Sequence, residues 1–426
     1  MNPNAPLSAD VDPCSAPGHG HPMLRLDDAR RRILEAVRPV AGQETLGLRQ
    51  ALGRVLGEPV CSTVDVPSHT NSAMDGYALA GEDLPATGER RFGVIGTSWA
   101  GRPYAGTVGS GQCVRIMTGA TLPPGTDTVV MQEDVRGDGD TAVIAAGHRP
   151  RQHRREAGED IRAGDVAVPA GTLLRPAHLG LIASVGVGQV HVRRRPRVAI
   201  FSTGDELRAI GEALAEGQIY DSNRYSVYGM VSRLGLEVLD LGVVRDRRED
   251  TQRAVEEAAA NADAIVTSGG VSVGEADYVV ETLRKSGKVG FWKVAMKPGK
   301  PIAFGHVGEA LFFGLPGNPV SAMVTFYQLV QPALKKLAGG IETDPPILLK
   351  ATCTSRLKKQ AGRLEFQRGI LDRDPQGGYV VRAASHQGAG VLRSMAESNC
   401  FIVLPLEQET VLPGAEVEVQ PFAGLV

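Results

Sequence analysis

The chain has 426 residues, which suggests about two to four domains. Its 46 basic and 48 acidic residues leave a net charge of −2, which argues against bulk electrostatic binding to nucleic acid or anionic membrane. Aromatic residues make up only 5% of the chain and Gly occurs 52 times, which favours a small-molecule enzyme over an RNA-stacking protein.

In chain order, residues 1–22 form a polar tail rich in Pro, Gly and Ser that lacks the features of a signal peptide. We predict a helix over 25–37, a second helical segment over 48–56, and a β-rich region over 61–159 made of short apolar runs separated by Gly, Pro and Asp. A further helix is expected over 177–185. The basic run 193–197 is interpreted as a solvated boundary.

From residue 198 onward, strands and amphipathic helices alternate. The predicted strands are 198–201, 237–241, 264–267, 289–294, 301–305 and 310–314, and the predicted helices are 223–234, 249–260, 275–286 and 320–337. This alternation is typical of a doubly wound parallel sheet. After a Gly- and Pro-rich linker over 339–346, residues 347–426 return to short strands and turns, which predicts a small β-domain or barrel.

The five cysteines are far apart and form no CxxC pair, so we expect neither a disulfide framework nor a zinc site. The longest uncharged stretch, 310–334, is interrupted by three prolines and several amides and does not fit a transmembrane helix. A soluble cytoplasmic protein is the expectation.

Polar, Gly-rich segments follow the predicted strands, where ligands bind in open parallel sheets. The segment 202–206 carries hydroxyls and two carboxylates, and it fits a plain turn with a helix cap about equally well. The segment 267–274 combines consecutive Gly and Ser with a helix start, which favours an anion site for phosphate. It has neither the Walker A nor the GxGxxG pattern.

Charged residues near these segments suggest a metal and a second anion. Asp246 and Asp277 suit Mg²⁺, although surface solvation and helix capping explain them as well. The stretch 293–301 places three lysines and two prolines at a strand exit, which favours oxyanion binding over a solvated loop. The segment 314–319 fits a ligand loop and a structural turn equally.

Asp75, Thr118 and Asp160 lie in turn-like stretches and are weak signals individually. No Ser-His-Asp or Cys-His pattern is evident. The residues therefore predict an enzyme that cleaves a phosphoryl or anhydride bond by positioning and charge stabilisation.

At these motifs the chain resembles the MoeA family of molybdopterin molybdenumtransferases, which also includes the E domain of gephyrin. The matching stretches run in order from about residue 24 to the C-terminus. They are NSAMDGYA (71–78), RIMTGATLPPG (115–125), GEDI (158–161), STGDEL (202–207), SGGVSVGEADY (268–278), FWKVAMKPGKP (291–301), GLPGNPVSA (314–322), FQRG (366–369) and HQGAG (386–390).

The resemblance implies an α/β plus β multidomain fold and a homodimer whose cleft lies between subunits. The implied parts are a tail (1–22), an extended domain in two segments (23–60 and 160–192), an inserted β-rich domain (61–159), a molybdopterin-binding α/β domain (193–339) and a C-terminal β-barrel (340–426).

The implied reaction inserts molybdate into adenylylated molybdopterin with Mg²⁺-dependent release of AMP. Contacts with the adenylyltransferase and with apo-molybdoenzymes are implied too. The implied catalytic residues are Asp75, Glu206, Asp246, Lys293 and Lys297. The implied metal ligands are Asp160, Glu206, Asp246 and Asp277. The implied substrate-binding residues are Thr118, Ser268, Gly269, Gly270, Ser272, Lys300, Pro316, Pro319 and Arg368.

Three alternatives remain open at this point. The adenylyltransferase resembles the α/β domain alone, so the three additional parts of this chain argue against it. A non-enzymatic scaffold would not need the acidic set. Tungstate is nearly equal to molybdate in size and charge, so the sequence does not separate them. Ala389 stands where many relatives carry Ser, which puts one hydroxyl contact in doubt.

Overall fold

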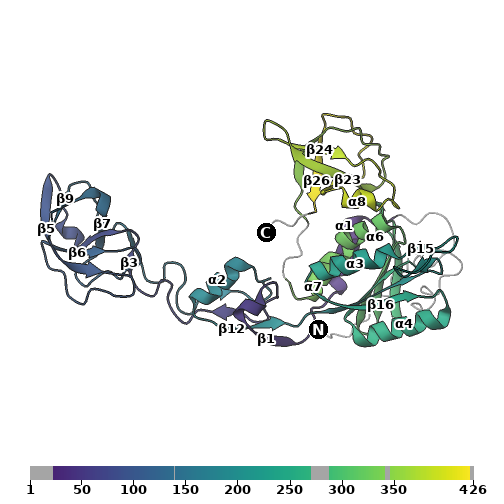
Figure 1. Cartoon of the computed structure of the whole chain (residues 1–426), viewed down its shortest axis with the longest axis horizontal. Helices are drawn as coiled ribbons and strands as arrows, with labels where there is room; N and C mark the ends of the chain where they lie inside the picture. The colour runs from purple at the N-terminus through teal and green to yellow at the C-terminus, as the bar shows by residue number, and fades with distance from the viewer. Residues whose placement is uncertain (1–22, 139, 270–286, 341–345, 423–426) are drawn as a thin grey trace. The chain divides into compact units, whose positions relative to one another are not determined.

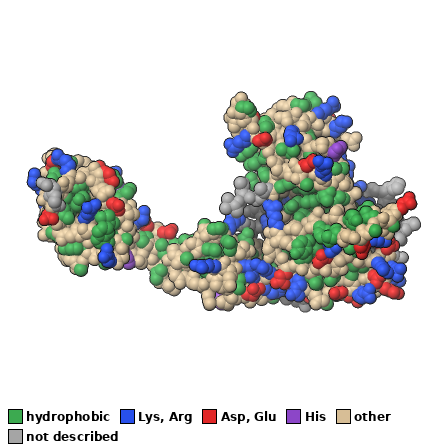
Figure 2. All heavy atoms as spheres, viewed as in Figure 1, with side chains coloured by type: hydrophobic (Ala, Val, Ile, Leu, Met, Phe, Trp, Pro, Cys, Tyr) green, Lys and Arg blue, Asp and Glu red, His purple; other side chains and the backbone are tan. Residues whose placement is uncertain are grey.

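The computed structural model describes residues 23–138, 140–269, 287–340 and 346–422 (Figure 1). The chain divides into two units: residues 45–192 form one, and the residues before and after them form the other. Each unit has its own buried apolar clusters. Within the described ranges, no helix is both long and apolar enough to cross a membrane. Basic and acidic side chains of these residues are interspersed on the face drawn in Figure 2.

A six-stranded sheet forms the centre of the α/β domain, with the strand order β16-β13-β17-β21-β20-β18. The first four strands are parallel, whereas β20 and β18 run antiparallel to their neighbours. This edge differs from the fully parallel sheet predicted, because a tight turn joins β20 directly to β21 and parallel neighbours need a long crossover. The strands are β13 (Arg197–Thr203), β16 (Glu237–Val244), β17 (Ala264–Ser268), β18 (Gly287–Lys293), β20 (Pro301–Val307) and β21 (Ala310–Leu315).

Helices cover both faces of this sheet, as the alternating pattern predicts (Figure 1). Strand β13 contributes alternate residues to two cores: Val198 and Ile200 to one, and Ala199 and Phe201 to the other. The first core also contains residues of α1 (Leu26–Ala36), α3 (Ser222–Arg233), α6 (Pro319–Thr325), the π-helical turn η4 (Phe326–Val330) and α7 (Gln331–Leu337). The second contains residues of α4 (Arg248–Asn261). A short ribbon, β14 (Leu207–Arg208) with β15 (Ile219–Tyr220), follows β13 in the chain.

The C-terminal domain is a closed five-stranded β-barrel, as predicted. Strand β23 pairs with both β24 and β25, which closes the ring. The barrel strands are β22 (Leu349–Cys353), β23 (Leu364–Arg373), β24 (Tyr379–Ala383), β25 (Cys400–Leu404) and β26 (Glu416–Pro421), and α8 (Arg393–Ala396) lies before β25. A two-residue strand from the α/β segment, β19 (Met296–Lys297), adds to β23. Phe366 and Phe401 of the barrel join the first α/β core.

The other unit carries the predicted β-rich domain, a six-stranded sheet in the order β7-β4-β6-β5-β9-β8. Leu79, Phe92 and Cys113 are fully buried in one of its cores. The elements are β4 (Gly76–Leu79), η2 (Gly81–Asp83), β5 (Glu89–Ser98), β6 (Gln112–Ile116), β7 (Thr128–Met131), η3 (Gln132–Asp134), β8 (Val135–Asp138) and β9 (Thr141–Ala145).

Three two-stranded ribbons accompany this domain. They are β1 (Gln43–Gly47) with β12 (Gln189–Arg193), β2 (Val60–Cys61) with β11 (Val166–Val168), and β3 (Asn71–Ser72) with β10 (Arg154–Arg155). The helix α2 (Pro176–Ser184) lies where it was predicted. The predicted helical segment 48–56 is largely wrong: only the 3₁₀ turn η1 (Leu48–Ala51) forms. Gly53 has a φ of +73°, which ends the turn, and Val55 and Leu56 form β-bridges instead.

Candidate functional site

A cavity of about 480 Å³ lies at the carboxyl ends of β17 and β21. Gly269 follows β17 and Pro316 follows β21, and these two strands are adjacent and parallel. Three segments of the α/β domain and two positions of the barrel line the cavity, which places it where open α/β sheets bind ligands. The lining residues are Gly269, Met296, Lys297, Pro298, Gly299, Lys300, Pro301, Pro316, Gly317, Asn318, Ser321, Arg363 and Ala389.

Backbone geometry gives Gly269 a specific role at this edge. Its φ is +88°, and a Cβ atom built there would lie 2.7 Å from the carbonyl oxygen of Thr203. A side chain at this position would therefore be strained twice, by conformation and by contact. Glycine lets the end of β17 pass close to the end of β13, and the backbone N of Gly269 donates to the carbonyl oxygen of Leu315 at 3.3 Å.

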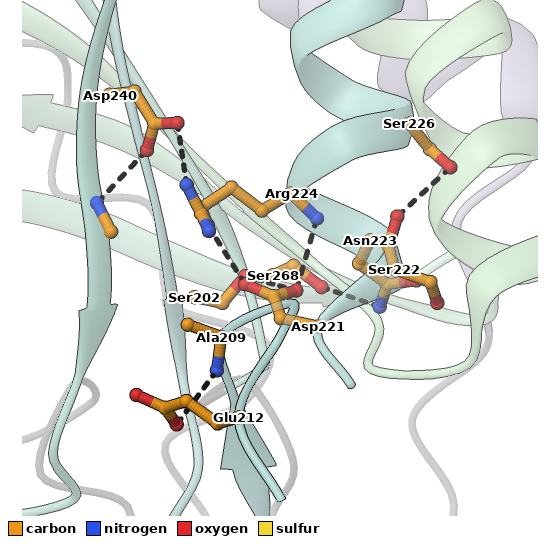
Figure 3. Close-up of polar contacts among 11 residues, drawn as sticks. Ser202, Ala209, Glu212, Asp221, Ser222, Asn223, Arg224, Ser226, Asp240 and Ser268 are labelled. Atoms are coloured by element: carbon orange, nitrogen blue, oxygen red, sulfur yellow. Dashed lines mark hydrogen bonds and ion pairs between the residues drawn. The ribbon is translucent and has the colours of Figure 1, made fainter. Parts of the chain in front are cut away.

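Asn223 joins two strand ends at the cavity, and its contact with Ser268 is drawn in Figure 3. Its Nδ2 donates to Oγ of Ser268 at 2.7 Å and to the carbonyl oxygen of Gly317 at 2.7 Å. Ser268 ends β17 and Gly317 follows β21, so one amide holds both strand ends. The Oδ1 atom of the same amide is buried without a hydrogen-bond partner in the described ranges.

An ion-pair network positions Asn223 by fixing the start of α3 (Figure 3). Asp221 accepts from the backbone N of Arg224 at 3.1 Å, from its Nε at 3.1 Å, and from Oγ of Ser202 at 3.1 Å. Arg224 also donates to Asp240 at 2.6 Å. Burial opposes the charge of Arg224, but the two carboxylates outweigh burial and raise its pKa.

The lysine-rich segment contributes two of its three lysines to the cavity, Lys297 and Lys300. Lys297 Nζ lies 2.9 Å from Oε1 of Glu365 on the barrel strand β23. Lys293, at the end of β18, is exposed and is not among the lining residues. Gly299 fits a tight space, because a Cβ there would lie 2.5 Å from Oγ1 of Thr325. The cavity is therefore cationic on this side.

Carboxylates gather at the other strand ends of the same edge. Strands β16 and β13 are parallel neighbours, and Asp246 follows the first while Asp205 and Glu206 follow the second. The backbone N of Asp246 donates to Oδ1 of Asp205 at 3.3 Å. Burial, and then the negative charges of Asp205 and Glu206, raise the pKa of Asp246. Like charges that disfavour each other's ionisation favour a cation between them. The described residues include no complete group of three metal ligands.

Arg368 is a buried guanidinium on β23, only 1% exposed. Its Nε donates to Oγ of Ser394 at 3.1 Å, and its Nη2 donates to the carbonyl oxygens of His386 and Gly388 at 3.3 and 3.2 Å. These acceptors are uncharged, and burial lowers the pKa of Arg368 to about 10. Arg368 thus holds the loop that leads to the cavity-lining residue Ala389.

Two of the predicted residues in the β-rich unit form a pair of their own. Oδ1 of Asp75 accepts from the backbone N of Thr118 at 2.7 Å and from its Oγ1 at 2.8 Å. These donors lower the pKa of Asp75, so the exposed carboxylate stays ionised. Asp160 is exposed in the same unit, where its backbone N donates to Val66.

The structure therefore brings together only part of the predicted set. Gly269, Lys297, Lys300 and Pro316 line one cavity, with Ser268 behind it. Pro319 opens α6 beside the cavity without lining it. Gly270, Ser272 and Asp277 lie outside the described residues.

Sequence reasoning missed three residues, Asn223, Ser321 and Arg363. Asn223 could have been found, because Asp-Ser-Asn before an apolar helical pattern is an N-terminal helix signature. Nothing local distinguishes Arg363 or Ser321, which reach the cavity only through the tertiary fold.

The fold and this site define a multidomain α/β protein that carries a cationic cavity beside its C-terminal barrel. Three family models match the chain. They are the MoeA N-terminal region (domain I and II) over residues 24–186, the probable molybdopterin binding domain over 199–336, and the MoeA C-terminal region (domain IV) over 350–422.

Whole-chain relatives agree with these models. The chain is 45% identical to a molybdopterin molybdenumtransferase of Haemophilus influenzae, over 95% of this chain and 100% of that protein. It is 36% identical to one of a Nostoc species, over 93% of each. A moeA molybdopterin biosynthesis protein of Pyrococcus horikoshii OT3 superposes with a TM-score of 0.81 at 28% identity, covering 94% of this chain and all of that one. The chain belongs to the MoeA family, as its motifs indicated.

Proposed function

We propose that this chain inserts molybdenum from molybdate into adenylylated molybdopterin and releases AMP, as its resemblance to molybdopterin molybdenumtransferases suggests. The observation that carries the proposal is the arrangement at one sheet edge. Carboxylates follow β16 and β13, whereas the Gly269 backbone and the cationic cavity follow β17 and β21. A substrate with a phosphate anhydride and an oxyanion needs both kinds of group.

The residues divide between two tasks in this proposal. Lys297, Lys300 and Arg363 supply positive charge to the anionic groups of the substrate and to molybdate. The backbone around Gly269 holds a phosphate. An oxygen of molybdate or of water bonds to the phosphorus of the molybdopterin phosphate as the anhydride P–O bond breaks. AMP then leaves with the negative charge that develops on its phosphate, and these cations stabilise that charge.

Mg²⁺ is the proposed metal. The residues present fit it, because the backbone N of Asp246 lies 3.3 Å from Oδ1 of Asp205, which puts carboxylates side by side, and hard oxygen ligands suit this ion. Asp246 and Glu206 would hold it, with Asp277 as a further ligand. Bound there, Mg²⁺ would neutralise charge on the anhydride oxygens.

Asp75, Thr118 and Asp160 are assigned to the same reaction through a homodimer. The two donors of Thr118 keep the carboxylate of Asp75 ionised, and this carboxylate is exposed. Its charge is therefore available to a second molecule. We therefore expect a cytoplasmic homodimer in which the β-rich unit of one copy completes the site of the other. Because the substrate and the product are labile, we expect contacts with the adenylyltransferase that supplies the substrate and with the apo-molybdoenzymes that take up the product.

The test follows AMP release from adenylylated molybdopterin with Mg²⁺, with and without molybdate. Wild type should release AMP in a molybdate-dependent manner and reconstitute an apo-molybdoenzyme, and Asp246→Asn should lose both. Asp250→Asn is the matched control, because Asp250 pairs with Arg253 on the surface of α4. Tight binding without AMP release would overturn the proposal and leave a carrier or scaffold, and a parallel arm with tungstate identifies the preferred oxyanion.

A further inference from the structure

The ion pair between Lys297 and Glu365 links the cationic segment to the barrel. Lys297 belongs to β19, which pairs in parallel with β23 so that Lys297 and Glu365 are direct cross-strand partners. The backbone N of Leu364 also donates to the carbonyl oxygen of Ala295 at 2.9 Å. The barrel strand therefore fixes both the backbone and the ammonium group of this lysine.

The two partners differ sharply in exposure. The Lys297 side chain is 49% exposed and lines the cavity, whereas the Glu365 side chain is 5% exposed and lies behind it. Oε2 of Glu365 accepts a second hydrogen bond from Nε2 of Gln367 at 3.1 Å. That amide donates in turn to the carbonyl oxygen of Lys358 at 3.0 Å. Both carboxylate oxygens thus have fixed donors.

A buried carboxylate is costly unless its partners are well placed, so the position of Glu365 needs an explanation beyond packing. A lysine side chain loses considerable rotamer freedom when it is held in one position. A carboxylate that holds the ammonium group in advance removes that cost from ligand binding. Glu365 is not itself a lining residue, and its Oε1 accepts a hydrogen bond from Lys297, which is one.

We propose that Glu365 is a positioning residue that holds the Lys297 ammonium group at the cavity wall, ready to meet the oxyanion. This inference rests on the proposed function, because it assigns the ammonium group to molybdate. Without Glu365 the ammonium group is no longer held at the cavity wall, and the oxyanion loses one charge-assisted hydrogen bond. Its binding should then weaken about tenfold. The effect should fall on KM for molybdate and leave kcat nearly unchanged, because the bond is formed in the ground state as well as the transition state.

A double-mutant cycle tests the coupling. Glu365→Gln keeps the shape and removes the charge, and it should raise KM for molybdate about tenfold. In the Lys297→Met background the same change should add nothing, since its effect passes through the lysine. Glu365→Asp should fall between wild type and Glu365→Gln. Independent, additive effects of the two changes would overturn the proposal.

The matched control is Glu416→Gln, which removes a different ion pair of the same barrel, the exposed pair of Glu416 with Lys350. It should leave KM and kcat unchanged.

A second readout does not need turnover: acylation of the Lys297 amine, followed by mass spectrometry. Acylation should be faster in Glu365→Gln than in wild type and unaltered in Glu416→Gln. If wild type shows no molybdate-dependent AMP release, the proposed function alone is refuted. If wild type and Glu365→Gln are acylated at equal rates, the positioning role is refuted.

Discussion

Replacing Asn223 with Ala should separate the two loops that its amide joins. The change removes two hydrogen bonds of 2.7 Å, one to Ser268 and one to Gly317. At about 0.5–1.5 kcal/mol of net stabilisation for each bond, the loss is about 1–3 kcal/mol. If the loss falls on ligand binding, kcat/KM for AMP release drops by about 5- to 150-fold, since about 1.4 kcal/mol corresponds to a factor of ten.

Three measurements check this reasoning. AMP release gives kcat/KM, urea unfolding gives the free energy of unfolding, and Asn223→Asp tests the donor, because it keeps the size but loses both N–H groups. Both Asn223 variants should be impaired. Ser226→Ala is the control: among the described residues Ser226 donates only to the carbonyl oxygen of Ser222 on the same helix, so activity should be retained. Full activity of Asn223→Ala would show that the loops are held in place by other contacts, and the reasoning would be refuted.

Three further predictions concern backbone strain and ionisation. Gly269→Ala should lower the free energy of unfolding by about 1–3 kcal/mol, measured in urea, because φ is +88° and Thr203 leaves no space for a Cβ. Thr118→Val removes one of the two donors that lower the pKa of Asp75, so a carboxyl NMR titration should show that pKa rising. An unchanged titration would mean that the backbone donor suffices. The pKa of Asp246 is higher in the folded state than in the unfolded state. Protonation of Asp246 therefore stabilises the folded state fully below the pKa of the unfolded state, and this stabilisation is lost as the pH rises through the pKa of the folded state. Asp246→Asn should therefore melt at a higher temperature than wild type at pH 7.5, and the difference should shrink at pH 4 or when Mg²⁺ is added. A difference independent of pH would contradict the assigned cause.

The α/β elements were predictable because their signals are local. Helices α3 and α4 begin and end within one residue of the predicted ranges, since their apolar residues recur with helical spacing between buried strands. The segment 48–56 shows the limit of such reasoning. Its apolar spacing resembles a helix, but the pairing of Val55 with Leu173, which is distant in the sequence, overrides that local preference.

The candidate site was predictable as a set of loops but not as a cavity. Gly-rich segments after strands indicated where a ligand binds, and Gly269 and Pro316 line the cavity as this reasoning requires. The pairing of Lys297 with Glu365 spans 68 residues of sequence and carries no local pattern. Arg363 likewise reaches the cavity from the barrel. Contacts of this kind depend on which strands meet in three dimensions.

The paired ribbons that accompany the β-rich domain make it a self-contained insertion. The outgoing chain at Val60–Cys61 and Asn71–Ser72 pairs antiparallel with the returning chain at Val166–Val168 and Arg154–Arg155. The two crossing segments therefore lie side by side, and the domain between them begins and ends at nearly one point. Domains with adjacent ends can be exchanged, lengthened or excised without opening the fold that hosts them. Evolution could thus remodel this module without changing the sheet that holds the cavity, whose six strands all follow the module in the sequence.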